Sequence, residues 1–172
     1  MKLLLTSAGF TNKTISDALL ELTGKPFKDL KLVFIPTAAN VETGWKEWLI
    51  TDLHNCLKLG FVKIEIVDIA AVGKSVWLPQ LEEADVIMFG GGNTRYLMKH
   101  LKKTGLDKLL PELLTTRIYV GISAGSMATG KGLSLTSDAI LYYENIGQFK
   151  EYAGLNFVNL SIRPHFHSKF FP

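Results

Sequence analysis

The chain has 172 residues, of which 47% are hydrophobic and 20% charged, and its formal net charge is +3. This balance is typical of one globular domain that is long enough to bury a core without disulfides or metals. The sequence has no long run of Lys or Arg of the kind that predicts nucleic-acid binding. It also has no apolar stretch of the roughly 18 residues that span a bilayer. The single cysteine, Cys56, is expected to be a buried thiol in a helix of a cytoplasmic protein.

Short apolar runs alternate with amphipathic segments along the chain, beginning with "KLLLT", which we interpret as a strand rather than a signal peptide. The predicted strands are 2–6, 31–38, 62–69, 84–93 (running into a glycine loop), 117–123 and 157–162. The predicted helices are 14–22, 44–59, 94–105 and 106–115. This order predicts an α/β fold, a three-layer sandwich with a mostly parallel central sheet.

Two glycine-rich segments follow predicted strands, at 90–92 and 121–125. Ligands of parallel sheets bind beyond the carboxyl ends of the strands, so the two segments can meet at one site. The second segment, "GISAG", matches G-x-S-x-G, in which Ser123 projects from a sharp strand-to-helix turn and the N–H of Ala124 can face an oxyanion. The pentapeptide alone also fits a structural turn, and both interpretations of Ser123 stay open here.

The first segment, "FGGGNT", lacks the residues of a P-loop or of a dinucleotide-binding loop. Its glycines allow a ligand to approach the backbone closely, and Gly91 or Gly92 can supply the second oxyanion N–H. Asn93 is expected to cap the next helix. A plain strand-to-helix turn with an Asn cap explains the same residues almost as well.

Four histidines are candidates for a catalytic base. His54 and His100 lie within predicted helices among lysines and leucines, which predicts surface or boundary positions. His165 differs because "RPHFH" follows a predicted strand and so shares the sheet end with Ser123. His165 and His167 could share one face of a strand as metal ligands, but no carboxylate cluster accompanies them, and we expect no metal and no cofactor.

The segments "FGGGNTRYLMKHLKKTGL", "GISAGS" and "RPHF", in this order, resemble the aspartyl dipeptidase (peptidase E) family of serine peptidases. The resemblance runs from "KLLLTS" to "PHF" and implies a fold similar to class I glutamine amidotransferases, which carry cysteine at the elbow. It also implies that Ser123 is the nucleophile and His165 the general base. Ala124 and one of Gly91 or Gly92 would then form the oxyanion hole.

The resemblance implies a substrate as well, namely small peptides and chiefly dipeptides with an N-terminal aspartate. Asp138 falls where the family has an acidic residue important for activity, and we assign it, with Asn93, to substrate binding. The side chain of a substrate aspartate needs a cation in the site. Arg163 is our candidate for this cation, although no motif supports the choice. We expect no nucleic-acid or membrane partner, and a homodimer is the default assembly on base rates alone.

Residues 1–172 are interpreted as a single peptidase-like domain that lacks the family's last strand and helix. In the family that segment supplies the acidic residue that orients the histidine, and loss of such a carboxylate costs about 10⁴-fold in rate in the serine protease triad. A rival hypothesis is therefore an inactive relative that serves as a binding or scaffold protein. A second rival is an esterase or amidase with another acyl group.

Overall fold

The computed structural model describes residues 1–133, 153–166 and 168. Its centre is a five-stranded parallel sheet with the strand order β1-β5-β4-β2-β3. The strands are β1 (Lys2–Thr6), β2 (Lys31–Ile35), β3 (Lys63–Ile66), β4 (Val86–Phe89) and β5 (Ile118–Ile122). Because all five run in one direction, their carboxyl ends form a single edge, where the two glycine-rich segments lie.

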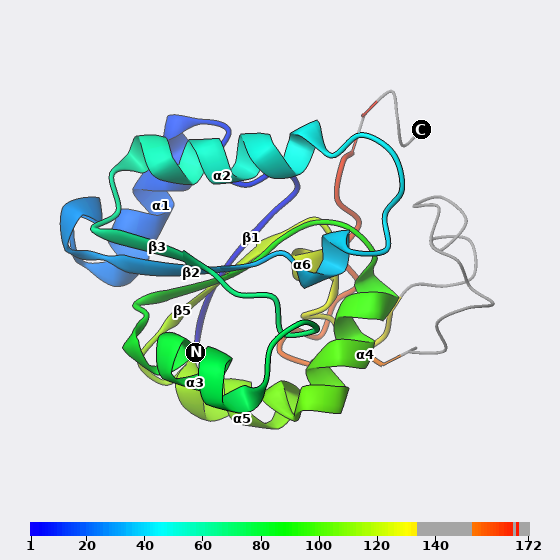
Figure 1. Ribbon diagram of the computed structural model, residues 1–172. Helices are drawn as coiled ribbons and strands as arrows, with labels where there is room; N and C mark the ends of the chain where they lie inside the picture. The colour runs from blue at the N-terminus through cyan, green and yellow to red at the C-terminus, as the bar shows by residue number, and fades with distance from the viewer. Residues whose placement is uncertain (134–152, 167, 169–172) are drawn as a thin grey trace.

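Helices cover both faces of the sheet (Figure 1). One face carries α1 (Lys13–Thr23) and α2 (Glu47–Leu59), and the other carries α3 (Lys74–Glu83), α4 (Thr94–Thr104) and α5 (Leu106–Leu113). Shorter turns are η1 (Phe27–Asp29), η2 (Thr37–Ala39) and α6 (Ala124–Met127). The predicted three-layer α/β sandwich is confirmed. No helix in the described part of the chain is long and apolar enough to cross a bilayer.

The central strands β2, β4 and β5 are apolar on both sides because each contributes to two cores. In β2, Val33 and Ile35 pack toward α3 to α5, whereas Leu32 and Phe34 pack toward α1 and α2. The same alternation continues in β4 and β5, and it follows from the two-residue period of a strand. Cys56 is fully buried in the second core, as predicted. The sheet is thereby fixed between two helical layers, which holds its carboxyl edge in place.

The structure adds one helix that the sequence analysis did not predict and shortens several elements. Helix α3 has little amphipathic periodicity and contains Pro79, although Trp77 and Leu81 are fully buried. The strand predicted at 31–38 ends at Ile35, because Pro36 leads into η2. Helix boundaries elsewhere agree with the predictions to within three residues.

The strand predicted at 157–162 was wrong. Phe157 and Val158 both donate their N–H groups to Thr129, and the only strand-like pairing in this described segment is a bridge from Gly130 to Val158. Asn156 has a positive φ of 56°, which interrupts an extended chain. The apolar side chain of Phe157 instead packs edge-on against Tyr119 in the core, with ring centroids 6.1 Å apart.

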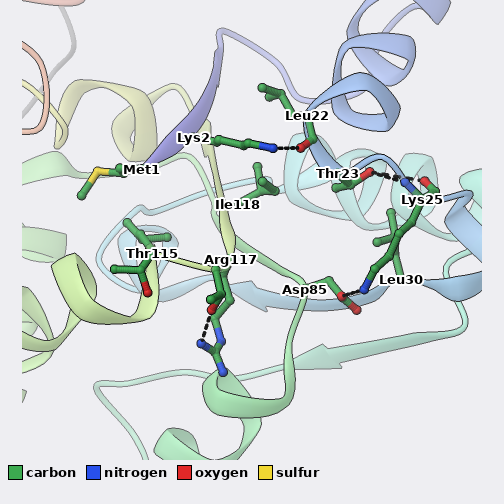
Figure 2. A pocket seen from close by; sticks show the side chains of 12 residues that line it. Met1, Lys2, Leu22, Thr23, Lys25, Leu30, Asp85, Thr115, Arg117 and Ile118 are labelled. Carbon is green, nitrogen blue, oxygen red and sulfur yellow. Dashed lines mark hydrogen bonds and ion pairs between the residues drawn. The ribbon is translucent and has the colours of Figure 1, made fainter.

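A small hollow of about 210 Å³ lies at the opposite, amino-terminal edge of the sheet (Figure 2). Its cations have partners within the protein, since Lys2 donates to the Leu22 carbonyl at 2.7 Å and Lys25 pairs with Asp85 at 2.7 Å. Arg117 donates to the carbonyl of Leu81 at 2.8 Å. These contacts join the amino ends of the strands to neighbouring elements, and the hollow lies away from both glycine-rich segments.

The stacked pair of Phe89 and Tyr119, with centroids 4.8 Å apart, should carry much of the core beneath the site. We expect Phe89→Ala to lower the free energy of unfolding by about 3–5 kcal/mol, because Phe89 is fully buried. Urea denaturation followed by circular dichroism measures this loss. Ile50→Ala, on an exposed position of α2, is the control and should change stability little. Equal losses in the two variants would contradict this account of the core.

Candidate active site

Ser123 occupies a strained turn between β5 and α6. Its backbone angles are φ 47° and ψ −106°, which a residue with a side chain rarely adopts and which cost on the order of 1–3 kcal/mol. The turn ends the strand abruptly and places the hydroxyl beyond the carboxyl edge of the sheet. This is the geometry that the motif G-x-S-x-G predicts for a nucleophile elbow.

The glycines on either side of Ser123 allow the turn to pack closely. A Cβ on Gly121 would lie 2.7 Å from the backbone nitrogen of Ser126, and one on Gly125 would overlap the carbonyl of Phe89. Neither neighbour is the end of a flexible side chain, so neither can move aside cheaply. The two glycines of the motif are therefore required by the approach of α6 to β4 and β5.

The end of β1 holds the elbow from the other side. The Thr6 carbonyl accepts hydrogen bonds from the Ser123 N–H at 3.0 Å and from the Ser126 hydroxyl at 2.8 Å. The Ser126 hydroxyl also accepts from the Thr6 N–H at 3.0 Å. Sequence reasoning missed Ser126, although a hydroxyl in an otherwise apolar buried turn is a usable signal. These bonds offset the strain of the turn and fix the direction of Ser123.

His165 lies directly beside the serine, with its Nε2 atom 2.9 Å from the Ser123 Oγ atom. Its backbone has a positive φ of 64°, and its N–H donates to the Ser7 hydroxyl at 3.1 Å. Burial lowers the pKa of the His165 imidazole from its ordinary value of 6.5. The ring is therefore neutral at physiological pH, and a neutral imidazole at this distance can accept a proton from the hydroxyl.

The backbone N–H groups of Gly91, Gly92 and Ala124 have no hydrogen-bond acceptor among the described residues, and Gly91 and Gly92 line the same cavity as Ser123. A Cβ on Gly91 would lie 3.5 Å from the Ser123 Cβ, so the two segments are in contact. Gly92 has a φ of 123°, and a Cβ there would overlap the Ala38 carbonyl. The two glycine-rich segments meet beside Ser123, as predicted. The assignment of their N–H groups to an oxyanion hole stays a prediction.

The other predicted residues lie elsewhere. Asn93 is buried and caps α4, accepting from the Tyr96 N–H at 2.9 Å, as the helix-cap prediction required. Arg163 is exposed and does not line the cavity beside Ser123. Asp138 lies outside the described residues. His100 was predicted at the surface or boundary but is only 8% exposed, because it packs against the ring of Tyr96.

A cavity of about 860 Å³ opens in front of the Ser123–His165 pair. Two tryptophans of the α2 region, Trp45 and Trp48, line it. So does Asp52 of α2, a residue that the sequence analysis did not select. In the described part of the chain, no group of three or more His, Cys, Asp or Glu side chains is arranged to hold a metal ion.

Asp52 is only 6% exposed and has no hydrogen-bond or ion-pair partner among the described residues. Burial raises the pKa of its carboxyl from 3.8 to about 7. Such a group destabilises the fold when charged, and perturbed carboxyls of this kind are concentrated at functional sites. Nothing in the local sequence "TDLHNC" distinguishes Asp52 from an exposed helical aspartate, which is why it was missed.

With the geometry described, comparison with known proteins identifies the class. A family model for peptidase family S51 matches residues 3–172, so the chain belongs to this family. The peptidase E resemblance is thereby confirmed.

Individual relatives agree. The uncharacterized peptidase Lmo0363 of Listeria monocytogenes is 32% identical over 144 residues, which are 80% of this chain and 66% of that protein. Peptidase E of Actinobacillus pleuropneumoniae serotype 7 is 32% identical over 83% of this chain and 56% of its own length. The chain thus spans between about half and two thirds of the length of these two relatives.

A solved structure of a Listeria monocytogenes EGD-e protein, provisionally named peptidase E, superposes with a TM-score of 0.82. The two sequences are 29% identical, and the match covers 98% of this chain and 81% of that one. A peptidase from an acI-B1 Actinobacterium has the same fold, with a TM-score of 0.70 at 21% identity over 98% of this chain and 69% of the other.

We expect Ser126→Ala to destabilise the protein by about 1–3 kcal/mol, because it removes both hydrogen bonds to Thr6 and leaves the partly buried Thr6 N–H without its hydroxyl acceptor. Urea denaturation measures the loss. Ser16→Ala is the matched control, since Ser16 is also buried but makes a single bond within α1. If both variants lose the same stability, Ser126 does not hold the elbow.

We expect Asp52→Asn to stabilise the protein at pH 8 but not near pH 4. Between pH 4 and 7 the unfolded chain ionises this carboxyl while the folded protein retains its proton, so the penalty grows with pH and levels off above 7. A shift from 3.8 to about 7 corresponds to at most about 4 kcal/mol. Urea denaturation at both pH values measures the gain, with Asp17→Asn on exposed α1 as control. A pH-independent effect of Asp52→Asn would contradict the assignment.

Proposed function

We propose that the protein is a serine peptidase that hydrolyses small peptides by acyl transfer through Ser123. The observation that carries this proposal is the 2.9 Å contact between the Ser123 Oγ and His165 Nε2 atoms, made by a serine in a strained elbow. A serine that only filled a turn would need neither a half-buried imidazole at its hydroxyl nor a cavity in front of it. Membership of peptidase family S51 supports the same chemistry.

In the proposed mechanism, the Ser123 Oγ atom attacks the scissile carbonyl carbon while His165 Nε2 takes the hydroxyl proton. The negative charge on the carbonyl oxygen is stabilised by the N–H groups of Ala124 and of Gly91 or Gly92. The C–N bond then breaks as His165 returns the proton to the leaving amine. Water attacks the acyl-serine ester with His165 again as base, which releases the acid and restores Ser123.

The resemblance to peptidase E extends the proposal to dipeptides with an N-terminal aspartate. The described lining of the cavity holds three carboxyl side chains, Glu42, Glu47 and Asp52, and no Lys or Arg. A substrate aspartate would therefore depend on a cation outside this lining. Comparing Asp-Leu with Asn-Leu and Ala-Leu measures how far the acidic side chain is recognised.

The test is hydrolysis of these three dipeptides by the 172-residue chain, beside Ser123→Ala and His165→Ala. We expect the parent to cleave at least one and each variant to lose about 10³-fold or more in kcat. A fluorophosphonate probe, which reacts with activated serines, should label the parent and not Ser123→Ala. Activity that survives Ser123→Ala would refute the mechanism, and a folded parent that neither cleaves nor is labelled would indicate a binding protein.

A further inference from the structure

Among the described residues that line the cavity, Asp52 is the buried ionisable side chain that the proposed mechanism leaves without a role. It is only 6% exposed, lines the same cavity as Ser123 and His165, and has no hydrogen-bond or ion-pair partner within the described residues. An unpaired carboxylate in such a place is costly, and the cost is removed when a cation binds beside it. Its position therefore indicates a ligand with a positive charge.

The described residues that line the cavity with Asp52 include no Lys or Arg. The other charged side chains among the described lining residues are Glu42 and Glu47, while the imidazole of His165 is neutral at physiological pH. Cys56, one turn along α2, stays a neutral thiol because burial, with the charge of Asp52, raises its pKa to about 12. The described lining thus contains carboxyl side chains and no Lys or Arg, a composition that favours cationic groups.

The position of Asp52 also limits which cation fits. A Cβ built on Gly9 would lie 3.3 Å from Asp52 Oδ1 and 3.0 Å from Ile122 Cδ1, and Ile122 immediately precedes the elbow serine. The carboxylate therefore lies near the Ile122 side chain at the end of β5, and a side chain in place of Gly9 would crowd it. A peptide's α-ammonium is one carbon away from its first carbonyl, so a group that binds it must lie near the nucleophile. The ammonium is compact and has three N–H donors, which suits a single carboxylate.

We propose that Asp52 binds the α-ammonium group of the substrate and thereby selects peptides with a free amino terminus. This inference rests on the proposed function and assigns a specificity-determining residue to it. The alternative roles of Asp52 make different predictions. A purely structural carboxyl would not distinguish free from blocked peptides, and a residue that positions His165 would affect both kinds of peptide equally.

The experiment measures binding without turnover. In a Ser123→Ala background, calorimetry gives the Kd of Ala-Leu and Asp-Leu and of their N-acetyl forms. We expect acetylation to weaken binding about 10- to 100-fold, as for a lost charged hydrogen-bonded pair. Adding Asp52→Asn should weaken the free peptides by a similar factor and leave the acetylated peptides unchanged, so that the two Kd values converge. Adding Asp17→Asn, on the exposed face of α1 and outside the cavity lining, should preserve the difference.

The inference is overturned if the preference for free amines persists in Asp52→Asn, if the parent has no such preference, or if no dipeptide binds. Labelling by the fluorophosphonate probe separates this failure from failure of the proposed function, because the probe carries no ammonium. Asp52→Asn with Ser123 intact should be labelled at the parent's rate, which also reports that the variant is folded. Loss of labelling in that variant would assign Asp52 to catalysis or folding and refute the ammonium role.

Discussion

The site depends on the contact between the end of β1 and the turn that follows β5. Ser123 has a backbone conformation that is unfavourable by itself, and the hydrogen bonds of Thr6 to the Ser123 N–H and to Ser126 hold it there. Since β1 and β5 are neighbours in the sheet, with Thr6 paired to Ile122, these hydrogen bonds follow directly from the strand order. Strain of this kind persists only where the surrounding structure determines it from several directions.

A second set of contacts brings the other glycine segment to the serine. Asp68, after β3, accepts hydrogen bonds from the Thr37 hydroxyl at 2.7 Å and the Asn40 side-chain amide at 2.8 Å. These bonds hold η2, whose Ala38 carbonyl accepts from the Asn93 N–H at 2.8 Å and passes so close to Gly92 that only glycine fits. The backbone donors near Ser123 are therefore positioned by the ends of β2 and β3 as well as by β4.

Much of this arrangement could be predicted from sequence because it depends on local patterns. Apolar runs gave the five strands, and glycines at strand ends indicated where two segments would converge on Ser123. Long-range information was missing for the rest. Pro79 and weak periodicity concealed α3, and in the apolar run 157–162 Phe157 packs on the core while Leu160 is exposed. Asp52 is notable because it is buried and lines the cavity. Both properties depend on tertiary packing and cannot be predicted from the residues beside it in the sequence.

The segment that carries His165 is bound to the protein differently from the segment that carries Ser123. Ser123 directly follows β5 in the middle of the fold, whereas His165 lies on a segment outside the five strands, with backbone bonds from 155–158 to 128–130 and from the His165 N–H to Ser7. A change confined to the 155–165 segment would therefore alter the distance between the Ser123 Oγ and His165 Nε2 atoms and leave the strand pairing unchanged. Catalytic alignment and sheet stability are set by different parts of the chain.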